Sequence, residues 1–197
     1  MQTDARRRLS PEERRDELLA FGQVFFADHP VDAFSMLEIA KRAGVSKGLL
    51  YNYFGGRRGF YVATVRAIAA DVADLTEPED DMSFADAFRR ALERYLDWVK
   101  DNGDAYRVLV QGGLGVDDEV GVIVEGLRRT SADRIARRAG LRRNQAIDLA
   151  LYGWACFAEH ACLEWISKRG VSRAAMVSLL TGALMGALMG CGVQIDA

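Results

Sequence analysis

A chain of 197 residues, half of them apolar, can bury its own core as one or two small domains. Its three cysteines, Cys156, Cys162 and Cys191, show no spacing typical of a disulfide framework or a zinc site, which argues against both classes. The net charge of −2 by itself argues against nucleic-acid binding, but the charge is unevenly distributed. Residues 1–66 carry 11 basic and 8 acidic side chains, whereas residues 67–197 carry 15 basic and 20 acidic ones. The N-terminal part is therefore the candidate for binding a nucleic acid.

The first predicted helix begins at Pro11 and ends before Pro30. Ser10 is the expected N-cap, and Glu13, three residues later, completes a capping box. Charges within residues 1–19 stand where a signal peptide would have its apolar core. Together with the unpaired cysteines, they predict a protein of the reducing cytoplasm.

Two short predicted helices come next, with a tight turn between them. The first begins behind a second capping box, Ser35 with Glu38, and ends at Gly44. The second begins at the N-cap Ser46 and ends before a pair of glycines. Residues 35–54 are therefore predicted to form a helix-turn-helix.

The rest of the chain is predicted to be helical as well. A fourth helix covers residues 57–75, and residues 76–81 form a linker. Further helices are expected over residues 83–101, 104–114, 117–139, 144–168 and 172–191. No alternating β pattern of useful length is present, so the fold class is all-α, with a small three-helix domain over residues 1–66 and a larger helical bundle over residues 67–197.

The helix-turn-helix assignment depends on small residues at fixed positions. The motif needs a small residue where the two helices approach, a turn glycine, and an apolar residue after it that locks the angle. Ala40, Gly44 and Val45 meet these three needs. In such a motif the second helix, here residues 46–54, lies in the major groove of DNA, with its N-terminal residues at base edges.

At these residues the chain resembles the TetR family of bacterial regulators. The family signature runs approximately E-I-A-x-x-A-G-V-S-x-G-x-L-Y-x-Y-F-x-x-K, and this chain reads Glu38-Ile-Ala-Lys-Arg-Ala-Gly-Val-Ser-Lys-Gly-Leu-Leu-Tyr-Asn-Tyr-Phe-Gly-Gly-Arg57. The resemblance covers residues 12–66. It implies a homodimer with one DNA-binding domain per subunit, acting as a repressor that a ligand releases from a palindromic operator.

The resemblance also implies individual DNA contacts. The residues implied at bases or the groove floor are Lys47, Gly48, Leu49, Asn52 and Tyr53, and those implied at phosphates are Ser35, Tyr51 and Arg57. Leu49 stands where the family usually has Thr or Ser, so it offers apolar contact, for instance to a thymine methyl group. Leu50 and Phe54 lie four residues apart on one face and are predicted to be core.

Aromatic residues on the later helices leave two interpretations open. They could be the ordinary core of a bundle, or they could line a pocket for a small apolar effector. For the second interpretation the expected lining is Tyr95, Trp98, Tyr106, Trp154, Phe157 and His160. Helical spacing does not by itself separate a cavity from a filled interior.

The C-terminal segment allows a soluble and a membrane interpretation. Residues 174–195 carry no charge over a length that could span a bilayer, and Gly182, Gly186 and Gly190 form a ridge of small residues along it. The resemblance favours burial of this segment in a dimer interface formed by residues 144–168 and 172–191, with no membrane contact. A membrane-anchored regulator is the alternative.

Catalysis is a further alternative, with weak support. No nucleophile elbow, phosphate loop or metal-ligand cluster occurs in the sequence, and His29 and His160 are its only histidines. We therefore expect a regulator that is not an enzyme and needs no cofactor or metal. Its expected partners are operator DNA, a small apolar effector and a second copy of the chain.

Overall fold

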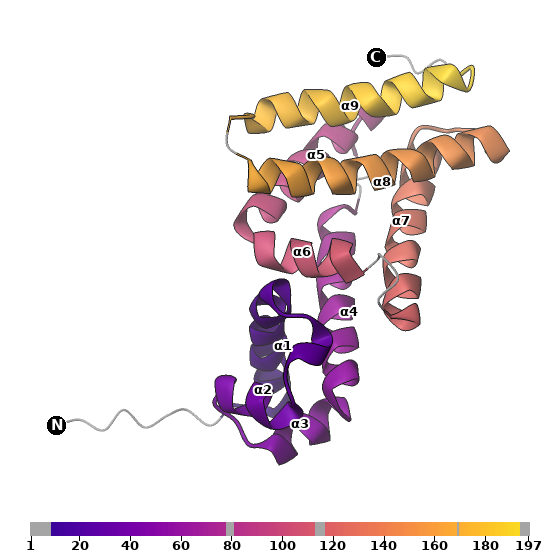
Figure 1. Ribbon diagram of the computed structural model, residues 1–197. Coiled ribbons are helices and arrows are strands. Elements are labelled where there is room, and N and C mark those ends of the chain that lie inside the picture. Colours follow the sequence, from indigo (N-terminus) through magenta and orange to yellow (C-terminus); the bar gives the residue numbers. More distant parts are fainter. Residues whose placement is uncertain (1–8, 78–80, 113–116, 169, 194–197) are drawn as a thin grey trace. The chain divides into compact units, whose positions relative to one another are not determined.

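The computed structural model describes residues 9–77, 81–112, 117–168 and 170–193, and it places no strand among them (Figure 1). The α-helices are α1 (Pro11–Asp28), α2 (Met36–Arg42), α3 (Lys47–Phe54), α4 (Arg57–Leu75), α5 (Phe84–Asp101), α6 (Gly103–Gly112), α7 (Asp118–Arg138), α8 (Gln145–Ser167) and α9 (Arg173–Gly190), with a 3₁₀ turn at Val31–Ala33. The all-α prediction is confirmed.

Three predicted features extend beyond the described residues. These are the middle of the linker at 78–80, the end of the 104–114 helix at 113–114, and the end of the uncharged segment at 194–195. The chain forms two compact units, residues 1–67 and 68–197, and α4 begins in the first and ends in the second.

Local capping explains where the helices of the first unit begin. The Ser10 hydroxyl accepts the backbone N–H of Glu13 at 3.1 Å, and the Glu13 carboxylate accepts the Ser10 N–H at 2.7 Å. Ser35 and Glu38 form the same reciprocal pair at the start of α2. Because these bonds satisfy N–H groups that the helix itself leaves free, both capping boxes are confirmed as helix starts.

The turn between α2 and α3 is closed by backbone bonds. The Val45 N–H donates to the Ala40 carbonyl at 3.0 Å, and the Gly44 N–H donates to the Lys41 carbonyl at 3.2 Å. Gly44 has φ +68°, a conformation that favours glycine. This is a Schellman motif, which ends α2 abruptly and lets Ser46 cap α3 four residues later.

Aromatic side chains fill the core of the first unit. Leu50 is completely buried and Phe54 is 9% exposed, as predicted. The Phe54 ring lies 4.7 Å from that of Phe60, and the Phe60 ring lies 5.4 Å from that of Phe26. These contacts hold α3 against the beginning of α4, and α4 against α1, so the other face of α3 is left for solvent or a partner.

The second unit is a helical bundle in which α8 and α9 lie side by side (Figure 1). One stripe of α9 is buried in this packing: Met176, Leu180, Leu184 and Leu188. The Trp154 indole N–H donates to the Leu180 carbonyl at 2.8 Å. α7 packs on α8, and α5 packs on both α8 and α9.

Candidate nucleic-acid interface and ligand pocket

The face of α3 that does not enter the core carries most of the predicted base contacts. The exposed side chains or positions on this helix are Lys47, Gly48, Tyr51 and Asn52, and the partly buried ones are Leu49 and Tyr53. The Lys47 ammonium lies 5.4 Å from the centre of the Tyr51 ring, within cation–π range. A cation, a phenol and an amide are therefore exposed on this helix.

Gly48 is a glycine that the protein interior does not require. A Cβ atom there would meet no atom within 4 Å, and the residue lies in the first turn of α3. A helical glycine lowers stability relative to alanine by roughly 0.5–1 kcal/mol. Because Gly48 has no side chain, a partner can approach the backbone of α3 closely at this position.

Ser35 and Arg57, the other residues expected at phosphates, already make bonds within the first unit. The Ser35 hydroxyl caps α2 and is exposed. The Arg57 guanidinium pairs with the Asp32 carboxylate at 2.6 Å and donates to the Phe34 carbonyl at 3.1 Å. Arg57 thus holds the segment before α2 against the start of α4.

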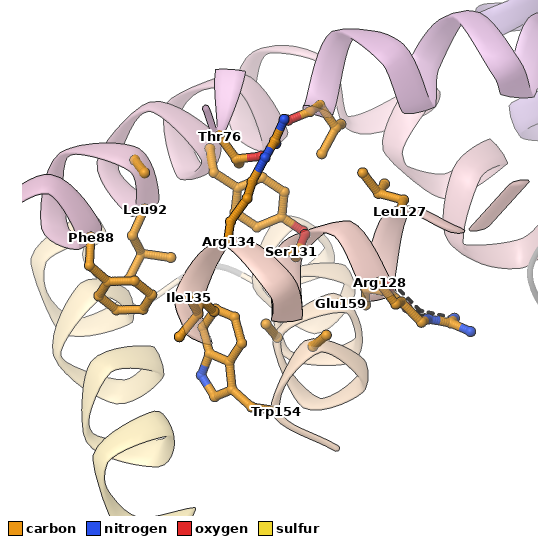
Figure 2. Close-up of a pocket in the computed structure, with 15 residues that line it drawn as sticks. Thr76, Phe88, Leu92, Leu127, Arg128, Ser131, Arg134, Ile135, Trp154 and Glu159 are labelled. Carbon is orange, nitrogen blue, oxygen red and sulfur yellow. Dashed lines mark hydrogen bonds and ion pairs between the residues drawn. The ribbon is translucent and has the colours of Figure 1, made fainter. Parts of the chain in front are cut away.

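A pocket of about 110 Å³ lies within the second unit. Most of its wall is apolar and comes from the end of α4 and from α5, α7 and α8, with Phe88, Leu92, Ile135 and Trp154 among the lining side chains (Figure 2). An engineered apolar cavity of about 150 Å³ is known to hold benzene. The pocket therefore fits a small molecule of about one ring.

Charged groups line another part of this pocket. Arg128 and Glu159 form a two-pronged ion pair, with nitrogen–oxygen distances of 2.7–3.0 Å, and their side chains are only 11% and 12% exposed (Figure 2). The hydrogen bonds to Glu159 raise the pKa of Arg128. The pair is self-neutralising, so its burial is compensated.

Tyr95 and Tyr106 form a buried hydroxyl pair beside the pocket. The two phenol oxygens are 2.7 Å apart, and the Tyr106 hydroxyl donates to the Glu159 carbonyl at 3.1 Å. Burial raises the pKa of both phenols well above the ordinary value. Both groups therefore stay protonated and serve as hydrogen-bond donors.

The structure brings two of the six predicted effector contacts to this pocket, namely Tyr95 and Trp154. Tyr106 is completely buried, and Trp98 packs against it with ring centres 6.5 Å apart, so these two belong to the filled core. Phe157 and His160 lie on the exposed side of α8, because the inner side of that helix is occupied by other residues. The other four predicted contacts are therefore not part of the pocket lining.

The sequence analysis did not predict Arg128, Arg134 or Phe88 as pocket residues. Both arginines lie on α7, whose sequence looks like a charged surface helix, and no local signal marks them as pocket residues. Glu159, the partner of Arg128, was also not among the predicted effector contacts. Within the described residues, no group of three or more His, Cys, Asp or Glu side chains could hold a metal ion.

α8 and α9 each carry exposed apolar residues, which together we call the α8–α9 face. Its large side chains are Leu149, Phe157, Leu179 and Met189, which are 42–71% exposed. The ridge of Gly182, Gly186 and Gly190 lies on α9, and a Cβ atom at any of the three would meet nothing within 4 Å. An apolar face of this kind marks an interaction surface.

α9 also satisfies a membrane criterion. Among the described helices it is the one long and apolar enough to cross a bilayer, by length and composition alone. A helix that is buried in a protein interior or interface passes the same test, so this observation is weak evidence for a membrane span.

Comparisons with known proteins extend the similarity over most of the chain. Residues 22–63 match the family model described as bacterial regulatory proteins, tetR family, and residues 84–186 match the tetracyclin repressor-like C-terminal domain. The HTH-type transcriptional activator FasR of Mycolicibacterium smegmatis is 27% identical over 169 residues, which cover 82% of this chain and 76% of that protein.

Solved structures agree with the fold. A TetR-family transcriptional regulator from Streptomyces coelicolor is similar with a TM-score of 0.78 and 26% identity, over 92% of this chain and 83% of that one. A TetR-like regulator from Rhodococcus sp. RHA1 is similar with a TM-score of 0.77 and 23% identity, over 93% and 100%. Since the matched family models cover more than half of the residues, this chain belongs to the TetR family of bacterial transcriptional regulators.

Proposed function

We propose that this protein is a homodimeric regulator that binds an inverted-repeat operator through α3 and changes its DNA affinity when a small effector enters the pocket of the second unit. The observation that carries the DNA-binding part is the exposed face of α3, where Lys47, Gly48, Tyr51 and Asn52 stand free of the core. A regulator of chromosomal DNA works in the bacterial cytoplasm, and the proposal includes no membrane contact, no cofactor and no catalysis.

The experiment that tests this proposal is selection of bound fragments from a random DNA pool. A two-fold dimer places its recognition helices in major grooves about 34–36 Å apart, or a longer helical repeat, so the enriched consensus should be palindromic. Absence of any enriched sequence would contradict the proposal. Ser35, Tyr51 and Arg57 are proposed at phosphates, whereas Lys47, Gly48, Leu49, Asn52 and Tyr53 are proposed at bases or the groove floor.

Two substitutions in the DNA-binding unit separate specificity from affinity. Asn52→Ala should reduce discrimination between operator and scrambled DNA by about 1–3 kcal/mol, because an amide reads base edges. Arg57→Ala should weaken both DNAs about equally and reduce the salt slope by about one, because the guanidinium is proposed to pair with phosphate. Titration at several salt concentrations measures both effects.

The matched control for these variants is Lys168→Ala, which removes an exposed cation at the end of α8. It should change neither the affinity nor the salt slope. An Asn52→Ala protein with unchanged sequence preference would remove Asn52 from the specificity contacts.

The α8–α9 face is proposed as the dimer interface. Gly186→Leu has open space within one chain, so it should leave the folded subunit intact. In a dimer the same side chain would overpack the helix crossing and separate the subunits, because close approach needs small residues. Sedimentation should show monomers and operator affinity should fall, since each half-site then binds alone.

Gly126→Leu is the control for this prediction, because Gly126 is an exposed helical glycine on α7 with equally open surroundings. It should remain dimeric. If Gly186→Leu also stays dimeric and soluble, the subunits meet elsewhere.

The direction of control is also part of the proposal. The resemblance implies a repressor released by its ligand, whereas the M. smegmatis relative is named an activator. We propose repression with release, and transcription in vitro from the selected operator measures it. Added protein should lower transcript yield, and a rise in yield would instead assign activation.

A further inference from the structure

The geometry points to a small carboxylic acid with an apolar body as the class of effector, and to Arg134 as the residue that senses its acidic group. This inference rests on the proposed function, because it names the ligand of the same pocket. It starts from a bond network that joins the pocket to the C-terminal end of α4.

Arg134 lines the pocket and caps α4. From α7 its guanidinium donates to the Ala73 carbonyl at 2.6 Å and to the Thr76 hydroxyl at 3.1 Å, and it pairs with the Glu77 carboxylate. α4 has no basic residue in its own last turn. The positive charge at the negative, C-terminal end of its dipole is instead supplied by Arg134, 61 positions after Ala73. Figure 2 shows the Arg134 side chain extending toward Thr76.

The charges in the pocket favour an anionic ligand. Arg128 is neutralised by Glu159 within the wall, whereas the acidic partner of Arg134 is Glu77, whose side chain is 59% exposed. Because the Glu77 carboxylate is the exposed member of this pair, it can return to water when another anion takes its place beside Arg134. A ligand carboxylate in this mostly apolar pocket would make a charge-assisted hydrogen bond to Arg134.

The other charge classes of ligand fit less well. A cationic ligand would have to take Glu159 from Arg128, which would leave a mostly buried guanidinium uncompensated. A neutral apolar ligand would fill the space but leave the bonds between Arg134 and α4 as they are. It would contact Val72 and Thr76 at the end of α4, but it would not compete for the hydrogen bonds that Arg134 donates, so it would not act on that link between α7 and α4.

An acid would also act on the helix that leads to the DNA-binding unit. If the acid takes Arg134, the Ala73 carbonyl keeps a hydrogen bond from the Thr76 hydroxyl at 3.2 Å, so α4 loses its link to α7 without an orphaned carbonyl. α4 is continuous from Arg57 to Leu75. Its N-terminal half belongs to the DNA-binding unit. A change in the bonds between Arg134 and the C-terminal end of α4 would therefore be transmitted along this helix to operator affinity.

The test compares acids with their neutral amides on the full-length protein. Benzoate and hexanoate are titrated against benzamide and hexanamide, with the fluorescence of the tryptophans, including pocket-lining Trp154, as the readout. We expect at least one acid to bind at least tenfold more tightly than its amide. If neither acid binds more tightly than its amide up to the solubility limit, the inference is overturned.

Arg134→Gln should abolish this preference for the acid and leave amide binding unchanged, and Arg134→Lys should restore part of it. The control is Arg129→Gln, an exposed arginine on the same helix, which should behave like the wild type. Acid binding by Arg134→Gln with wild-type affinity would overturn the assignment of Arg134. The wild-type comparison of acid and amide needs no variant, so it decides the ligand class even if Arg134→Gln folds poorly.

The coupling is measured on the operator obtained from the random pool. The acid should weaken operator binding of the wild type at least fivefold, and Arg134→Gln should be insensitive to it. If a bound acid leaves the operator affinity unchanged, the sensing role of Arg134 is overturned. A protein that selects no DNA but still prefers acids would contradict the proposed function and leave the ligand class supported.

Discussion

Gly59→Ala is expected to abolish operator binding by disrupting the DNA-binding unit. A Cβ atom at position 59 would lie 2.0 Å from the backbone carbonyl oxygen of Phe54, at the point where α3 ends and α4 begins. A backbone atom cannot move aside as a flexible side chain can, so the cost should be about 3 kcal/mol. Thermal unfolding and operator titration measure the two effects.

Gly126→Ala is the matched control for that substitution. It adds the same methyl group to an exposed helical glycine with nothing within 4 Å, so it should raise stability by roughly 0.5–1 kcal/mol and leave DNA binding unchanged. A Gly59→Ala protein as stable as the wild type would show that the α3–α4 junction has more freedom than the geometry allows.

Glu159→Gln is expected to destabilise the second unit by about 3 kcal/mol, because it leaves the mostly buried Arg128 without its short-range partner. The nearest other carboxylate, that of Glu125, is 4.0 Å from Arg128. For a chain of this size the loss corresponds to a fall in the unfolding midpoint of roughly 10 °C. Calorimetry or circular dichroism measures it.

The control on the same helix is Glu164→Gln, which breaks an exposed pair with Lys168 and should change stability by less than about 0.5 kcal/mol. The double variant Arg128→Gln with Glu159→Gln should recover much of the loss, because the uncompensated charge is gone. If Glu159→Gln and Glu164→Gln lower the stability equally, the pair between Arg128 and Glu159 is not desolvated.

The sequence by itself determined the helices and the motif that names the family. Ser10 and Ser35 bond to glutamates three residues away, and the N–H groups of Gly44 and Val45 close the turn with carbonyls three and five positions away. Because every partner is local, the pattern of residue types specifies the geometry before any long-range packing. The burial of Leu50 and Phe54 follows in the same way from their spacing on one short helix.

Only the tertiary structure decided which side chains form the pocket. Helical spacing places aromatics on faces, but the neighbouring helices decide which face is covered, so Trp154 lines the cavity whereas Phe157, three residues later, is 42% exposed. The role of Arg134 is equally non-local, because the carbonyl it caps lies 61 residues away. A contact over that separation depends on how α4 and α7 pack together, and neither helix carries a local signal for it.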